Sequence, residues 1–399
     1  MKIGKIEISK IIIIVLVAIL GIMASYEFLE LRFYREDVVV SDSFTEEKML
    51  SDWLPSIKNT AVDAPVYIFD SGVPGGSVLI CGGIHPYEPA TTLAAYVIMN
   101  NINVEKGKVF IIPRTNMSAA TLGMLGNAYP KFFTIETEWG EKKIRIGDRA
   151  TNPLHQWPDP FVYVNYPSGQ NLAYTDIRNM NRTFPGKEDG SLTERGSYAL
   201  MELTRKENID LYIDLHEASL MYPVVSTYVA HQDAQDIAMM ASMVLSASEF
   251  PMKCEVSPSN LHGLTHREVG DYSDAYAVLM ETPEPFIDRV AGRMTEELMT
   301  DGIDEFIQTA AENDLIYCNY DINEGITMPS GYVVKGAPMD YRVGRHLSAT
   351  REVITWMGQF DPAKEVIVTF PGFIDVMDNG SGFYLSDPEE ADESKVFKN

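Results

Sequence analysis

One histidine in this sequence stands three residues before a glutamate, directly after an apolar run. His85 and Glu88 follow residues 77–81, which read as a short buried strand, and two glycines that allow a tight turn. Pro89 suits the first turn of a helix that begins there. At this spacing an imidazole and a carboxylate can converge on one ion. A surface turn with an incidental ion pair is the alternative.

A second histidine ends another apolar run. His216 closes the run 210–215, and Asp214 lies two residues before it among leucine and isoleucine. A charge in such a strand is costly unless it is used, and one use is to orient a metal-bound imidazole. Two nitrogens and one carboxylate, with a fourth position left for water, are the ligands expected of a catalytic zinc.

A third apolar run delivers an acid. Glu281 follows residues 277–280 and precedes a threonine and a proline. An acid at the end of a strand beside a metal can act as a general base toward water. A helix-capping or surface glutamate is the alternative interpretation.

Four short motifs occur in order along the chain, and together they resemble the zinc carboxypeptidase superfamily, in particular its succinylglutamate desuccinylase and aspartoacylase branch. The resemblance covers roughly residues 65–310. The motifs are Gly82-Gly83-Ile84-His85-Pro86-Tyr87-Glu88-Pro89, Asn179-Met180-Asn181-Arg182-Thr183-Phe184-Pro185-Gly186, Asp214-Leu215-His216-Glu217 and Leu279-Met280-Glu281-Thr282.

The resemblance implies a role for each matching residue. The metal ligands would be His85, Glu88 and His216, holding one zinc ion per chain. Asn181 and Arg182 match the pair that grips the substrate carboxylate, where a planar guanidinium suits bidentate binding. Glu281 would then be the general acid and base of the reaction.

The family also uses an arginine upstream of that pair to stabilise an oxyanion. We predict Arg149, because it lies in the long aromatic segment 117–180, which reads as an active-site loop; Arg114 and Arg178 are the alternatives. A loop near residues 257–268 is expected to approach the site from the side of Glu281. A contact with the substrate is predicted there for His266 or Arg267, with loop structure as the alternative.

Two stretches of the sequence depart from the family pattern, and no position can be assigned to the tyrosine that lines the pocket in digestive carboxypeptidases. Pro86-Tyr87 stands where Gly-Asn is usual, which changes the rim of the site and keeps the ligands. Residues 314–399 do not match the second domain of aspartoacylase. The substrate of either branch therefore cannot be carried over.

The elements that must position these residues alternate between strand and helix. Strands are expected at 77–81, 109–112, 210–215 and 275–280, and helices at 89–99, 193–205, 233–248 and 289–311. Beyond residue 314 we expect a helix at 348–357, short strands and a frayed polar end from 387. This alternation predicts an α/β fold with a central, mostly parallel (mixed) sheet flanked by helices, as in zinc carboxypeptidases.

The N-terminus predicts a membrane segment. Lysines precede a charge-free run from Ile11 to Ala24, and apolar character continues to about Leu31. Acidic residues dominate after it, so an uncleaved anchor would leave the rest of the chain outside the cytoplasm. A cleaved signal peptide and a secreted product are the alternative. The expected organisation is an anchor at 1–35, a polar stalk at 36–64 with a short helix at 46–54, a catalytic domain at 65–313 and a small C-terminal region with a polar tail at 314–399.

Composition limits the function further. The formal net charge of −25 disfavours nucleic-acid binding. The favoured hypothesis is a zinc-dependent hydrolase that cleaves an amide bond in a small anionic amide or peptide outside the cytoplasm, as an N-acyl amino acid deacylase or a carboxypeptidase-type peptidase. The alternatives are a non-catalytic surface module that binds a peptide or partner in its cleft, and a cytoplasmic aminoacylase. The oligomeric state is not indicated.

Overall fold

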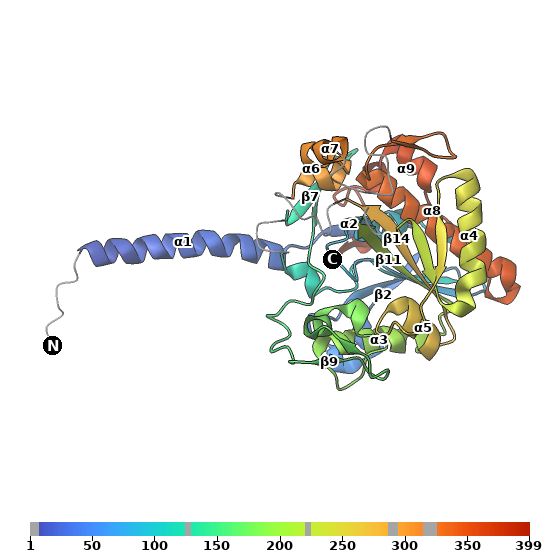
Figure 1. Cartoon of the computed structure of the whole chain (residues 1–399), viewed down its shortest axis with the longest axis horizontal. Helices are drawn as coiled ribbons and strands as arrows, with labels where there is room; N and C mark the ends of the chain where they lie inside the picture. The colour runs from blue at the N-terminus through green and yellow to red at the C-terminus, as the bar shows by residue number, and fades with distance from the viewer. Residues whose placement is uncertain (1–7, 124–128, 220–224, 286–293, 314–324) are drawn as a thin grey trace.

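The chain builds one large mixed sheet with helices on both faces (Figure 1). The structure is a computed structural model that describes residues 8–123, 129–219, 225–285, 294–313 and 325–399. The eight strands of the main sheet lie in the order β13 (Lys253–Val256), β12 (Thr227–Ala230), β14 (Tyr276–Glu284), β11 (Leu211–Ser219), β4 (Ser77–Cys81), β6 (Lys108–Ile112), β3 (Pro65–Asp70) and β2 (Phe44–Met49).

The centre of the sheet is parallel and buried on both faces. β14, β11, β4 and β6 run side by side in parallel, whereas β12 pairs antiparallel with β14, and β3 and β2 close the other edge antiparallel. Because both faces of a parallel strand are covered, its residues read as continuous apolar runs, as at 77–81 and 211–215. The carboxyl ends of β4, β11 and β14 therefore meet at one edge, where ligand sites form.

Two layers of helices cover the sheet, each with its own apolar core. α2 (Pro89–Asn101), α4 (Gln235–Ser248) and α8 (Met339–Phe360) pack with one face, which buries Ile213 and Leu215 of β11. α3 (Leu192–Lys206) and α5 (Thr265–Tyr272) pack with the other, which buries Tyr212. Asp214 and His216 share the face of Tyr212 because side chains alternate along a strand. The predicted α/β sheet flanked by helices is confirmed.

Three expected segments differ from the structure. Residues 46–54 form the end of edge strand β2 and a 3-10 turn at Leu50–Asp52 rather than a helix, so part of the expected stalk contributes to the main sheet. The start of the helix expected at 289–311 lies outside the described residues. From residue 294 on, the structure has two short helices instead, α6 (Glu296–Asp301) and α7 (Glu305–Glu312). They are separate because Gly302 adopts a left-handed conformation with φ +75°. The helix expected at 348–357 is the longer α8.

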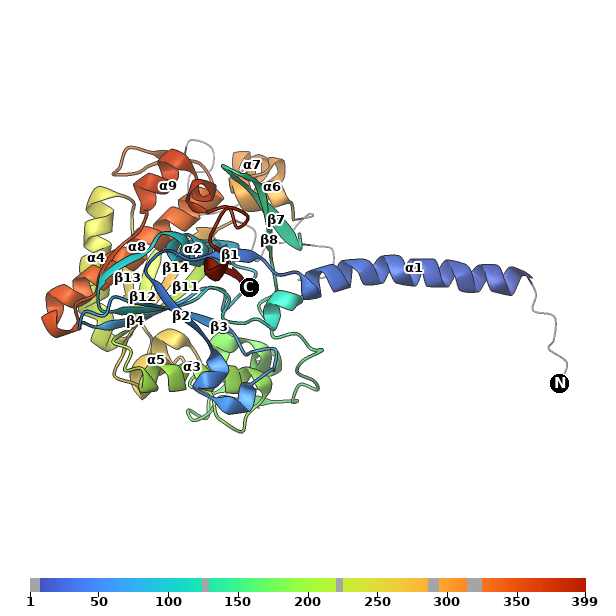
Figure 2. The same cartoon turned by 180° about the vertical axis from the view of Figure 1, so that it is seen from behind.

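The segment that follows the N-terminal helix meets the C-terminal end of the chain. The N-terminal helix α1 (Ile8–Phe33) projects from the body, and β1 (Asp37–Val39) behind it pairs with β18 (Val396–Lys398), as Figure 2 shows from behind. Asn399 is fully buried, so the expected fraying of the last residues is wrong. α1 is long and apolar enough to be either a membrane span or a signal sequence.

The long segment 117–180 is also largely structured. It contains the hairpin of β7 (Phe132–Thr137) and β8 (Gly140–Arg145) and the small hairpin of β9 (Tyr163–Val164) and β10 (Asn171–Leu172). Further short pairs join β15 (Ile326–Thr327) to β16 (Val333–Val334) and β17 (Ile367–Thr369) to β5 (Asn103–Lys106). A last helix, α9 (Phe373–Asn379), packs on α8.

Candidate metal centre and active-site cavity

Three predicted ligands come from the ends of two neighbouring strands. His85 follows β4 across a turn in which Gly83 has φ +58°, a conformation that glycine adopts without strain. Glu88 is the residue before the first turn of α2, and Pro89 opens that helix. His216 lies on β11, and all three side chains are buried.

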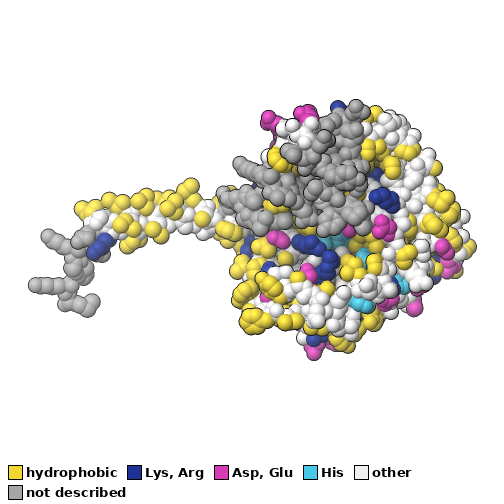
Figure 3. Space-filling view, in the orientation of Figure 1, with side chains coloured by type: hydrophobic (Ala, Val, Ile, Leu, Met, Phe, Trp, Pro, Cys, Tyr) yellow, Lys and Arg dark blue, Asp and Glu magenta, His cyan; other side chains and the backbone are white. Residues whose placement is uncertain are grey.

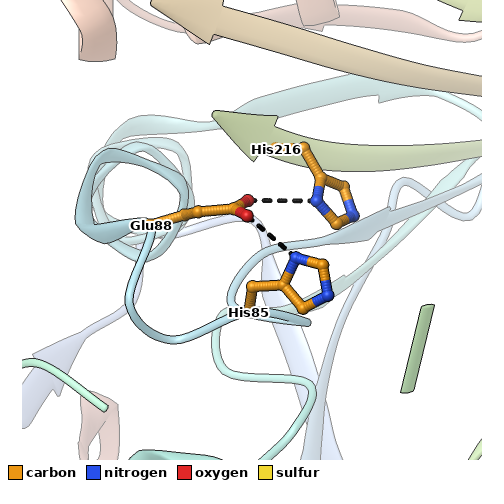
Figure 4. Close-up of side chains that lie close together, drawn as sticks. All are labelled: His85, Glu88 and His216. Carbon is orange, nitrogen blue, oxygen red and sulfur yellow. Dashed lines mark hydrogen bonds and ion pairs between the residues drawn. The ribbon is translucent and has the colours of Figure 1, made fainter. Parts of the chain in front are cut away.

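The three side chains converge on one point (Figure 4). His85 Nδ1 lies 2.8 Å from Oε1 of Glu88, and His216 Nδ1 lies 3.0 Å from Oε2 of the same carboxylate. The two imidazole rings stand almost perpendicular, with centroids 4.7 Å apart. One potential ligand atom from each residue lies within 4.8 Å of the other two, close enough for a single cation to contact all three.

The opposite nitrogen of each imidazole has an oxygen partner. His216 Nε2 lies 2.9 Å from Oδ2 of Asp214, which also accepts a hydrogen bond from the Thr265 hydroxyl at 2.5 Å. His85 Nε2 lies 2.8 Å from Oδ1 of Asn179. Such contacts fix the tautomer and the orientation of metal-binding imidazoles. Asp214 thus lies where it could orient the imidazole of His216, as expected from the sequence. No role was predicted for Asn179.

The electrostatics of the cluster suit a cation. Burial lowers the pKa of His85 to about 4. Burial alone would raise the pKa of Glu88, but His85 and His216 hold it well below its usual range. For His216 burial also disfavours the charge, yet the carboxylates of Asp214 and Glu88 raise its pKa well above the usual value. Without a metal, a proton on His216 supplies positive charge between these carboxylates, which is the charge that a bound cation would provide.

Glu281 stands beside this cluster on the next strand. It is the direct neighbour of His216 in the parallel pairing of β11 with β14. Burial raises its pKa to about 8, with Glu88 and Asp214 adding to the rise and His216 opposing it. Its Oε2 has no hydrogen-bond partner among the residues that the structure describes. A buried carboxyl group with an uncommitted oxygen beside a metal site is suited to accept and release a proton.

All eight predicted site residues line one cavity of about 280 Å³. Arg149, Asn181, Arg182 and His266 join the ligands and Glu281 there. Figure 3 shows basic and histidine side chains together in a hollow of the surface, with hydrophobic side chains beside them. The alternatives to Arg149 are committed elsewhere, because Arg114 is buried against Glu36 and Arg178 pairs with Asp159.

The polar side of the cavity is held by a short 3-10 turn at Met180–Arg182. The Asn179 side chain accepts from the Asn181 backbone N–H, and Asn181 Oδ1 accepts from the N–H of Thr265 at 2.9 Å. Asn181 Nδ2 lies 3.4 Å from His216 Nε2. His266 Nδ1 lies 2.7 Å from the hydroxyl of Ser257, and burial lowers its pKa to about 3, so the imidazole is neutral at pH 7.

Part of the cavity lining is apolar. Six side chains from β12, β13, β14 and the connection between β13 and α5 form it: Val229, Val256, Pro258, Leu261, Leu264 and Leu279. The cavity lining therefore combines cationic groups with aliphatic side chains. A ligand that matched both would carry a carboxylate and an apolar group.

The comparisons with known proteins give matches among solved structures only. No family model and no curated protein matches the sequence. Solved structures do match, among them an aspartoacylase family protein from Mesorhizobium loti (19% identity, TM-score 0.33, 55% of this chain and 56% of that one) and a succinylglutamate desuccinylase from a Silicibacter species (15%, 0.34, 55% and 53%). Both names belong to the branch whose motifs the sequence resembles.

A third match is the cell shape determinant protein Csd4 from Helicobacter pylori, with 11% identity and a TM-score of 0.39 over 76% of this chain and 56% of that one. The chain thus spans little more than half the length of the structures it matches. At these scores the likeness is too distant to assign an activity, a metal or a substrate. Those are inferred below from the residues of the cavity.

Proposed function

We propose that this protein is a zinc-dependent hydrolase of amide bonds, with His85, Glu88 and His216 as the ligands of one metal ion. The observation that carries the proposal is the convergence of two imidazoles and one carboxylate, whose potential ligand atoms lie within 4.8 Å of one another beside the carboxyl group of Glu281. Two imidazoles and a carboxylate suit zinc better than calcium or magnesium, which prefer oxygen ligands.

Each remaining polar residue of the cavity has a role in this proposal. Zinc bound by the three ligands would act as a Lewis acid toward the substrate carbonyl and lower the pKa of water. Glu281 accepts a proton from the water that attacks the carbonyl carbon. It returns that proton to the departing nitrogen when the carbon–nitrogen bond breaks. Arg149 stabilises the negative charge that develops on the carbonyl oxygen.

The cavity also suggests the kind of substrate. Arg182 and Asn181 would bind a carboxylate, and the apolar side would take an aliphatic or aromatic group. A volume of about 280 Å³ suits a small molecule or the end of a peptide rather than a folded protein. We therefore favour an N-acyl amino acid or a short peptide, with His266 contacting it from the side of α5.

We further propose that α1 is an uncleaved membrane anchor and that the body lies outside the cytoplasm. Lysines precede the apolar run and acidic residues follow it, which is the asymmetry expected of that orientation. Treatment of intact cells with protease, followed by detection of the truncated chain, tests the orientation. Full protection of the body would contradict it.

Replacement of Glu281 tests the catalytic proposal. The full-length Glu281→Gln protein should keep about one zinc per chain and lose at least ~10²-fold in hydrolysis of N-acyl amino acids and short peptides, because Gln cannot move the proton. Metal content is measured by elemental analysis and hydrolysis by mass spectrometry of the products.

The surface variant Glu305→Gln on α7 is the matched control and should keep full turnover. A fully active Glu281→Gln protein would contradict the assignment. A wild-type protein that binds no zinc and hydrolyses none of these substrates would favour the non-catalytic binding module instead.

A further inference from the structure

An exposed apolar surface lies in the segment between β8 and α3. We call residues 154–174 the aromatic segment. Seven of its large apolar side chains are exposed, with exposed fractions from 47% for Val164 to 103% for Phe161. The others with high exposure are Leu154, Trp157, Val162, Tyr166 and Tyr174. Contiguous exposed groups of this kind mark a contact with a partner or a membrane.

This surface lacks charge, although the protein as a whole is strongly charged. Charged residues make up 22% of the chain, and the net charge is −25. Within the aromatic segment the sequence contains a single acid, Asp159, and no lysine or arginine. The side chain of Asp159 is buried, with Oδ2 3.0 Å from Nε of Arg178. Its histidine, His155, has a pKa lowered by burial and by Arg32, so it is neutral at pH 7.

The polar side chains of the segment hold it in place and turn the apolar ones outward. Gln156 accepts hydrogen bonds from the backbone N–H and the hydroxyl of Thr193, at 2.8 and 2.7 Å. The Tyr163 hydroxyl donates to the carbonyl of Arg182, and Asn165 Nδ2 donates to the carbonyl of Phe184 at 2.9 Å. The exposed aromatic side chains therefore occupy a fixed surface.

The segment lies beside the base of α1. Arg32 in the last turn of that helix is 3.4 Å from Nε2 of His155. The last turn of α1 is itself docked on the body, because Leu31 is buried and Glu30 pairs with Lys143 at 2.6 Å. Figures 1 and 2 both show the segment on the side from which α1 leaves, and Figure 3 shows hydrophobic side chains gathered there.

The distance along α1 places the base of the helix, and the aromatic segment beside it, near the outer edge of the headgroup region of a bilayer. The charge-free run of α1 ends at Tyr26, and Arg32 lies six residues further, which is about 9 Å along a helix at ~1.5 Å per residue. The headgroup region on each side of a bilayer is roughly 5–8 Å thick. Tryptophan and tyrosine concentrate in that region because their rings are amphipathic.

From these observations we infer that the aromatic segment is a second membrane contact, which inserts Trp157 and Phe161 into the lipid interface next to α1. The inference rests on the proposed anchoring of α1. Lipid is the partner that the surface fits, because the contact is apolar, uncharged and adjacent to the span. Two points of contact, together with the docked base of α1, would hold the body in one orientation on the bilayer.

Fluorescence of the full-length protein in phosphatidylcholine vesicles tests this contact. The chain has four tryptophans, and none lies in residues 1–33, so quenching by brominated lipid chains reports on the body alone. Trp53 is buried, and Trp139 and Trp356 are partly buried. We expect brominated lipid to quench the wild-type emission and most of that quenching to disappear in Trp157→Phe. Quenching that survives in Trp157→Phe, or is absent from the wild type, would overturn the inference.

A charge placed on the same surface provides a second test. Phe161→Glu should push the segment out of the lipid and remove most of the quenching of Trp157. Met243→Glu is the control, because Met243 is 59% exposed on α4, on the side of the body away from α1, and its variant should be quenched as the wild type is. Unchanged quenching in Phe161→Glu would overturn the contact. Hydrolysis measured on the same samples reports separately on the proposed activity.

Discussion

Asp214 connects two elements to the candidate metal centre. Its Oδ2 lies 2.9 Å from Nε2 of His216 and accepts the hydroxyl of Thr265 at the start of α5. A carboxylate in this position raises the basicity of the imidazole and keeps Nδ1 directed at the metal. An amide in its place would keep the shape and lose the charge.

We therefore predict that Asp214→Asn weakens zinc binding about 10- to 100-fold, the range typical for such partners. Competition with a chromophoric zinc chelator measures the affinity of the full-length protein in detergent. Asp236→Asn, an exposed change in the first turn of α4, should leave the affinity unaltered. Equal affinities for wild type and Asp214→Asn would show that the carboxylate does not support the ligand.

The sequence was sufficient to point to the candidate metal centre because its histidines follow or end apolar runs, a pattern that can be recognised without tertiary information. The sequence did not predict that Asn179 supports His85, although Asn179 stands two residues before Asn181 in the same motif. Its contact with His85 depends on a turn that brings together residues 94 positions apart. Residues that support a ligand from another element carry no periodicity of their own, so only the fold reveals them.

At the scale of elements, α8 shows why the start of a helix is hard to predict from sequence when its polar residues are buried. The helix was expected at 348–357, yet it begins at Met339. Its first half contains Arg342, Arg345 and His346, which look like a solvent-facing stretch and are all buried. The reason lies on the sheet, where Thr282 meets His346 at 3.0 Å and Glu217 meets Arg342 at 3.5 Å.

The pair of Glu217 and Arg342 joins α8 to the strand that carries His216. Glu217 Oε2 accepts the backbone N–H of Ala90 in the first turn of α2, and the backbone N–H of Glu217 donates to Glu88. Burial raises the pKa of Glu217 to about 7, while Arg342 lowers it. A pKa raised above the unfolded value means that this group favours folding at low pH and opposes it as the pH rises through about 7.

We predict that Arg342→Met destabilises the protein more at pH 8 than at pH 5. At pH 5 Glu217 is protonated and loses no ionic partner, whereas at pH 8 its charge would be buried without one, at a cost of about 3–5 kcal/mol. Thermal unfolding in detergent at the two pH values measures the difference. In the Glu217→Gln background, Arg342→Met should lower the midpoint of unfolding by the same amount at both pH values. A pH-independent effect in the native background would mean that Arg342 acts only through packing.

At the scale of the whole molecule, the base of the N-terminal helix and the last residues of the chain form one buried cluster. Glu36 pairs with Arg114 at 2.7 Å, and its backbone exchanges two hydrogen bonds with Asn399. Asn399 also donates to the hydroxyl of Tyr96 on α2 at 2.8 Å. The polar composition of residues 387–399 gave no sign of this, because their partners lie at the other end of the sequence. The cluster fixes the direction in which α1 leaves the body.

We predict that removal of residues 396–399 lowers the midpoint of thermal unfolding by several degrees. The deletion takes away β18, leaves β1 without its partner and exposes the Glu36–Arg114 pair, and each buried polar group left unpaired costs roughly 1–3 kcal/mol. Lys398→Ala removes only the surface ion pair with Asp37 and keeps the strand, so its midpoint should change little, since exposed pairs contribute about 0–1 kcal/mol. If the deletion lowers the midpoint no more than Lys398→Ala does, the base of α1 is held by the contacts of Leu31 and Glu30, and the pairing of β1 with β18 contributes little.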